Sequence, residues 1–100
     1  MQHTVKLFIE QHDLACPVMA RYIDLVSETG ELGKELLKAT DYGKADFQPN
    51  DRITLEAGDC LFSLLALMNE LGIDAQQALN SVLHKYEQRI QQQGSAGSGR

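Results

Sequence analysis

The chain has 100 residues, a net charge of −5 and 43% hydrophobic residues. That length fits one domain, and the acidic balance excludes broad contact with a nucleic acid backbone or an anionic membrane, both of which attract lysine and arginine. We expect one domain over residues 1–93. Residues 94–100 read GSAGSGR and hold no apolar side chain larger than alanine, so we expect a flexible tail or a cloning remnant there.

The two cysteines, Cys16 and Cys60, stand among apolar residues with no second Cys or His at zinc-finger spacing. Buried free thiols are therefore expected, and they fit a reducing cytosol. No basic segment followed by an apolar core marks a signal peptide, and no run of about 18 apolar residues marks a membrane span. We expect a soluble, cytoplasmic protein.

Apolar residues recur in steps of three and four, which predicts helices along the whole chain. A short first helix runs from about Thr4 to His12. Asp13 is a candidate N-cap for a long helix over residues 14–39, with Pro17 in its early turns. Gly43 and Pro49 interrupt the pattern, so residues 40–51 are predicted to be a loop.

A second long helix is predicted from Asp51 or Arg52 to Leu71, where Gly72 is a natural C-terminal stop. Asp74 can cap a last helix that runs to about Gln92. The fold class is therefore all-α, a helical bundle. Because about 90 structured residues bury only about 60–70% of the surface of the unfolded chain, we expect oligomerisation to complete the bundle.

Acidic residues fall on one side of each long helix. At about 100° per residue, Glu28 and Glu31 share an arc of roughly 60° on the first long helix, together with Asp24 and Glu35. Such an arc alone is commonly a solvated face. The second long helix changes this interpretation, because Glu56 and Asp59 share an arc at the start of a segment that is apolar nearly all the way round.

Two acidic helix edges that face each other would raise the pKa values of their own carboxylates unless a cation lay between them. Oxygen ligands without a nearby histidine favour magnesium or manganese over zinc. A di-iron bundle normally needs Glu-x-x-His motifs, and no histidine of this chain lies three residues after a glutamate. The sequence therefore predicts a magnesium-type site between the two helices.

The motifs that carry these acids have a family likeness. The segments SETGELGKELLKA, with Glu28 and Glu31, and LEAGDCLFSLLALMNELGID, with Glu56 and Asp59, resemble the paired metal-binding motifs of MazG-like pyrophosphohydrolases. The short single-domain members and the dCTP pyrophosphatases are the most similar. A third segment, ALNSVLHKYEQRI, is similar to the basic C-terminal helix of the family. The likeness spans residues 21–90 and departs at Ser27, where many members carry glutamate.

The resemblance implies a MazG-like helical bundle assembled as a homodimer or homotetramer. It also implies magnesium-dependent hydrolysis of nucleoside or deoxynucleoside triphosphates to the monophosphate and pyrophosphate. Four acids would ligate Mg²⁺, for which Mn²⁺ could substitute: Glu28, Glu31, Glu56 and Asp59. Glu31 or Glu35 would in addition orient the attacking water.

Lys85 and Arg89 lie four residues apart on one face of the last helix, where they would bind phosphates or simply complement the helix dipole. Many family members carry asparagine where Leu83 stands, two residues before Lys85. Tyr42 and Phe47 are candidates for a base pocket or lid. Two alternatives stay open: a pyrophosphohydrolase for phosphoribosyl-ATP or a modified nucleotide, and a non-catalytic helical dimerisation or regulatory module.

Overall fold

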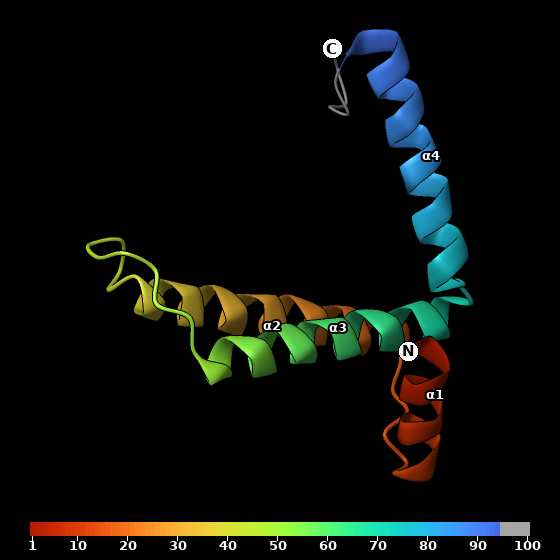
Figure 1. The fold of residues 1–100 in the computed structure, drawn as a ribbon. Coiled ribbons are helices and arrows are strands. Elements are labelled where there is room, and N and C mark those ends of the chain that lie inside the picture. The colour runs from red at the N-terminus through yellow and green to blue at the C-terminus, as the bar shows by residue number, and fades with distance from the viewer. Residues whose placement is uncertain (95–100) are drawn as a thin grey trace.

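The computed structural model describes residues 1–94, so residues 95–100 of the predicted tail lie outside the described residues. Four helices follow one another along the chain: α1 (Gln2–Gln11), α2 (Val18–Ala39), α3 (Asp51–Leu71) and α4 (Ala75–Gln93). The described residues contain no strand, so the prediction of an all-α fold is confirmed (Figure 1).

Helices α2 and α3 lie side by side as an antiparallel hairpin (Figure 1). The start of α3 is fixed by Asn50, whose side-chain oxygen accepts a hydrogen bond of 3.0 Å from the backbone N–H of Ile53. The helix ends at Gly72, which has the left-handed φ of 69° that glycine adopts without strain. Both ends of α3 confirm the boundaries predicted from the sequence.

The predicted start of α2 is wrong by four residues. Asp13 has a φ of 52° and belongs to the turn that ends α1, and α2 begins at Val18 after Pro17 in extended conformation. The physical reason is Pro17, since a proline disfavours helical backbone in the residue before it. The guanidinium of the buried Arg21 donates a hydrogen bond to the carbonyl of Leu14, which holds this connection against α2.

The buried core lies where α1 crosses the end of α3. Val5 and Ile9 of α1 pack with Leu65 and Ala66 of α3. Gln2 stabilises the contact between α1 and the end of α3 through two hydrogen bonds. Its side-chain amide donates one of 2.6 Å to the carbonyl of Ile73 and accepts one of 2.8 Å from the backbone N–H of Ala75. The α1 helix is thereby fixed to both α3 and the turn that follows it.

Helix α4 projects away from the hairpin and contains no buried residue (Figure 1). Asp74 caps it as predicted, accepting from the backbone N–H of Gln77 at 2.9 Å. The radius of gyration is 16.9 Å, compared with about 13 Å for a compact chain of this length. A single chain therefore has the predicted helices but does not close them into a compact bundle. None of the described helices combines the length and the apolarity needed to cross a membrane.

Candidate metal centre

Three carboxylates meet between α2 and α3. Glu28 of α2 and Glu56 and Asp59 of α3 each offer one oxygen, and these oxygens all lie within 4.8 Å of one another. Glu56 and Asp59 are three residues apart and so face the same side of α3, while the antiparallel pairing of the hairpin brings Glu28 opposite them. We call Glu28, Glu56 and Asp59 the acidic cluster.

The acidic cluster is electrostatically unfavourable by itself. Burial raises the pKa of Glu28, and the neighbouring charges raise it further in the order Asp59, Asp24, Glu56 and Glu31. A cation held by these oxygens would relieve the repulsion. Carboxylate oxygens with no imidazole among them are the donors that hard divalent ions such as Mg²⁺ prefer.

Glu31 lies outside the acidic cluster but close to it. It stands one helical turn after Glu28 and is exposed, and its charge contributes to the raised pKa of Glu28. The structure thus brings together three of the four predicted metal ligands and leaves Glu31 at the rim of the cluster. An exposed carboxylate at this place is free to contact water or substrate.

Glu35 occupies a different environment from Glu31. Its side chain is buried, and it forms ion pairs of 3.5 Å with Lys38 and 3.8 Å with Arg52 of α3. These contacts hold Glu35 as a link between the two helices. The sequence reasoning missed Arg52, although its position four residues before Glu56 places it on the same side of α3 and could have indicated it.

A second polar link between the helices lies on the other side of the acidic cluster. The hydroxyl of Ser63, which is only 2% exposed, donates a hydrogen bond of 2.9 Å to the Oδ2 of Asp24. Asp24 is four residues before Glu28, and Ser63 is four residues after Asp59. Helical periodicity places Asp24 on the side of Glu28 and Ser63 on the side of Asp59, but it does not indicate that the two residues pair. This bond fixes the register in which Glu28 faces Asp59.

Cys60 is the sulfur group nearest in sequence to the acidic cluster, and it remains a free thiol. Burial raises its pKa first, followed by the negative charges of Glu28, Asp59 and Glu56. A thiol with a raised pKa stays protonated at neutral pH and is a poor nucleophile and metal ligand. Cys16 is also free, as expected from the sequence, but both cysteines are only partly buried and not buried as predicted.

The two predicted phosphate ligands, Lys85 and Arg89, lie on α4 and not beside the acidic cluster. Because α4 projects away from the hairpin, one chain does not bring them to the carboxylates (Figure 1). The ammonium of Lys85 instead lies 5.3 Å from the centroid of the Tyr86 ring. Arg52 and Lys38 are the cations that the described structure pairs with a carboxylate next to the cluster.

Fold and site together define a class: an α-helical protein in which two acidic helix edges form a centre suited to a divalent cation. The family model of the MazG nucleotide pyrophosphohydrolase domain matches residues 19–93, which include α2 from its second residue and all of α3 and α4. The chain therefore belongs to the MazG family of nucleotide pyrophosphohydrolases, and the resemblance found in its motifs is confirmed. The searches found no matching curated protein and no matching solved structure.

Proposed function

We propose that this protein hydrolyses nucleoside or deoxynucleoside triphosphates to the monophosphate and pyrophosphate, with Mg²⁺ held by the acidic cluster. The observation that carries this proposal is the convergence of carboxylate oxygens of Glu28, Glu56 and Asp59 within 4.8 Å of one another, on two of the helices in the region that the family model matches. Mn²⁺, which prefers similar oxygen ligands, is the expected substitute.

The reaction adds one water to the α-phosphorus. A bond forms between the water oxygen and phosphorus, the bond from the α-phosphorus to the bridging oxygen breaks, and pyrophosphate leaves with that oxygen. When bound, the divalent ion supplies positive charge beside the phosphate oxygens and favours loss of a proton from the attacking water. The acidic cluster holds the ion at the hairpin surface, where Asp59 is exposed to an incoming substrate.

Glu31 is the better of the two candidates for accepting the proton of the water. It is exposed and lies one turn from Glu28, so its carboxylate can reach a water at the cluster. Glu35 is buried, and its carboxylate oxygens are engaged in ion pairs with Arg52 and Lys38. We propose that Glu35 positions Arg52, and that Arg52 meets the negative charge of the phosphate chain.

An assay of released products tests the proposed function. The purified chain should release pyrophosphate and monophosphate from at least one nucleoside triphosphate when Mg²⁺ is present, and none when Mg²⁺ is removed with EDTA. The substrates should include all common ribo- and deoxyribonucleotides and phosphoribosyl-ATP, with products separated by ion-exchange chromatography. If phosphoribosyl-ATP were the only substrate hydrolysed, the protein would instead be a phosphoribosyl-ATP pyrophosphohydrolase. Absence of turnover and of thermal stabilisation by Mg²⁺ plus nucleotide would favour the regulatory module.

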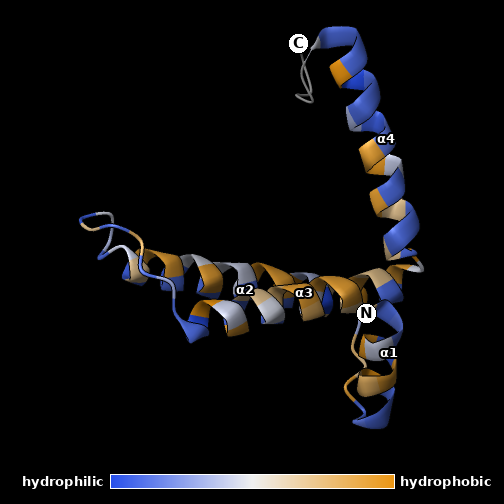
Figure 2. Cartoon of the chain, in the orientation of Figure 1, coloured by the Kyte–Doolittle hydropathy of each residue, from blue (hydrophilic) through white to orange (hydrophobic). Residues whose placement is uncertain are grey.

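We further propose that the active form is a homodimer or homotetramer. Four exposed apolar residues recur along one side of α4 at steps of four, three and four, namely Leu79, Leu83, Tyr86 and Ile90. Figure 2 shows hydrophobic residues recurring along this otherwise hydrophilic helix. An isolated helix with an unburied apolar stripe is stabilised by packing against another chain. Phosphate contact by Lys85 and Arg89 would then come from the α4 of another copy.

Leu83→Asp should convert the oligomer to the 11.1 kDa chain, because it places a charge in the middle of the apolar stripe. Light scattering coupled to size exclusion measures the mass directly. Ser81→Asp is the matched control, because Ser81 lies on the opposite side of α4 and is exposed. A wild-type mass of one chain, or equal masses for Leu83→Asp and wild type, would contradict this proposal.

A further inference from the structure

An open cavity adjoins the acidic cluster on the side of α1. It has a volume of about 390 Å³ and is lined by Thr4, Val5 and Phe8 of α1 and by Asp59 and Phe62 of α3. Asp59 belongs both to this lining and to the acidic cluster. A ligand whose charged part is held at the cluster can therefore place an uncharged part in the cavity.

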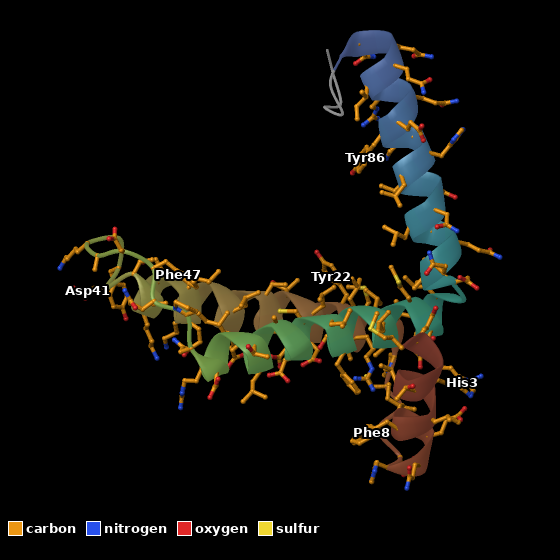
Figure 3. All side chains as sticks on the ribbon, in the orientation of Figure 1. His3, Phe8, Tyr22, Asp41, Phe47 and Tyr86 are labelled. Atoms are coloured by element: carbon orange, nitrogen blue, oxygen red, sulfur yellow. The ribbon has the colours of Figure 1, made fainter. Side chains whose placement is uncertain are left out.

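Two aromatic rings form its walls. The rings of Phe8 and Phe62 meet edge to face, with centroids 6.0 Å apart and planes at 88°. Phe62 packs against the buried core, whereas Phe8 is 47% exposed and points from α1 into the corner between α1 and the hairpin (Figure 3). The Phe8 ring is half-exposed and is held by the partly buried Phe62 and by the His12 ring, whose centroid lies 4.5 Å away, so it offers a fixed aromatic surface for a planar ligand. The Thr4 hydroxyl adds a hydrogen-bonding group.

The cavity and Arg52, a cation that pairs with Glu35, lie at opposite ends of the acidic cluster. Along α3, Arg52 precedes Glu56 by four residues, whereas Phe62 follows Asp59 by three. At about 1.5 Å per residue, Arg52 and Phe62 are separated by about 15 Å along the helix, with the carboxylates between them. This order matches a nucleotide, in which a planar base and a highly charged phosphate chain stand at opposite ends of the molecule.

We propose that this cavity is the seat of the nucleobase, and that Phe8 stacks on it. The proposal rests on the proposed function, since it supposes that the phosphate chain is bound through a divalent ion at the acidic cluster. It also fixes the direction of the substrate: the base lies towards α1, and the pyrophosphate leaves towards Arg52. Within one chain, the loop that carries Tyr42 and Phe47 lies at the far end of the hairpin from α1, so these two rings do not reach this cavity (Figure 3).

The chain contains no tryptophan, which provides a direct test of stacking. Phe8→Trp should fluoresce from the cavity, and Mg²⁺ with a nucleoside triphosphate whose α,β-bridge is an uncleavable imido group should quench this emission. Mg²⁺ with inorganic triphosphate should leave it unchanged, because that ligand has charge but no base. Leu7→Trp is the matched control, since Leu7 is similarly exposed on α1 but does not line the cavity.

A binding measurement completes the test. Stacking of a base on an aromatic ring contributes about 1–3 kcal/mol to binding. The affinity of Phe8→Ala for the imido analogue, measured by calorimetry, should therefore be about 5- to 150-fold lower than that of the wild type. Its affinity for inorganic triphosphate with Mg²⁺ should match that of the wild type, which also shows that the fold and the metal centre are intact. The proposal that the cavity binds the base would be wrong if Phe8→Ala lowered the affinity for both ligands equally. It would also be wrong if the imido analogue did not quench the fluorescence of Phe8→Trp. Hydrolysis by the wild type would then still support the proposed function, whereas failure of the wild type to bind either ligand would overturn both.

Discussion

Asp59→Ala is expected to lower kcat by about 1,000-fold or more while leaving the helix content unchanged. Asp59 supplies one of the three oxygens of the acidic cluster and lines the adjoining cavity. A divalent ion contributes several kcal/mol of transition-state stabilisation, and each 1.36 kcal/mol is tenfold in rate, so loss of a ligand has a large effect. Its side chain is exposed, so removing it leaves no cavity in the core.

The measurement is pyrophosphate release under saturating Mg²⁺ and nucleotide, with circular dichroism to follow the helices. Asp51→Ala is a suitable control, because Asp51 is an exposed acid in the first turn of the same helix and is not part of the acidic cluster. Near-normal turnover by Asp59→Ala would mean that the reaction takes place elsewhere on the chain.

Glu28→Gln is expected to have opposite effects on the metal-free and the metal-bound protein. Without metal, burial and then the neighbouring negative charges raise the pKa of Glu28, so the neutral amide should raise Tm by a few degrees. With Mg²⁺ present, the same variant loses a ligand and should show little or none of the thermal stabilisation that the wild type gains from the ion. The variant should therefore have the higher Tm without metal, and the wild type should have the higher Tm with Mg²⁺.

The pH dependence follows from the direction of the shift. A raised pKa means that the folded protein binds the proton of Glu28 more tightly than the unfolded chain does, so protonation stabilises the fold. In EDTA, the advantage of Glu28→Gln should therefore shrink as pH falls from about 7.5 through the raised pKa towards the ordinary value of a glutamate, about 4.3. Stabilisation of the wild type by Mg²⁺ should weaken over the same range, because the ion requires the ionised carboxylate.

Scanning calorimetry across this range gives both quantities. Glu10→Gln is the matched control, since Glu10 is an exposed acid on α1 that is remote in sequence from the acidic cluster and does not contribute to the pKa of Glu28. A metal-free Glu28→Gln protein that melts below the wild type at neutral pH would show that the carboxylates do not repel one another as the structure indicates.

Most of the residues that start and end the helices could be identified from the sequence alone. Asp74 caps the start of α4 and Gly72 ends α3 with left-handed backbone, both as predicted, whereas Asn50, the cap of α3, was identified only in the structure. These features depend on residues within one turn of each other, so the sequence determines them directly. The error at Asp13 arose because two local signals compete there, and the restriction that Pro17 imposes on Cys16 outweighed the preference of aspartate for an N-cap.

The acidic side of each long helix could also be predicted from the sequence, because helical periodicity decides which residues share a side of one helix. Periodicity does not decide which part of α2 meets which part of α3. The Asp24 to Ser63 hydrogen bond and the ion pair of Glu35 with Arg52 show the register that the folded hairpin adopts. That register, and not the motif spacing, places Glu28 in the acidic cluster and leaves Glu31 at its rim.

The sequence by itself determined that the protein is helical, where most helices begin and end, and which carboxylates lie on the same side of each. Only the tertiary structure decided that α1 crosses α3 beside Asp59, so that Phe8 and Phe62 wall a cavity next to the acids. It also showed that α4 leaves the hairpin with its apolar stripe uncovered. The physical reason is that caps and periodicity are local properties of the backbone, whereas helix crossings depend on packing between side chains far apart in sequence.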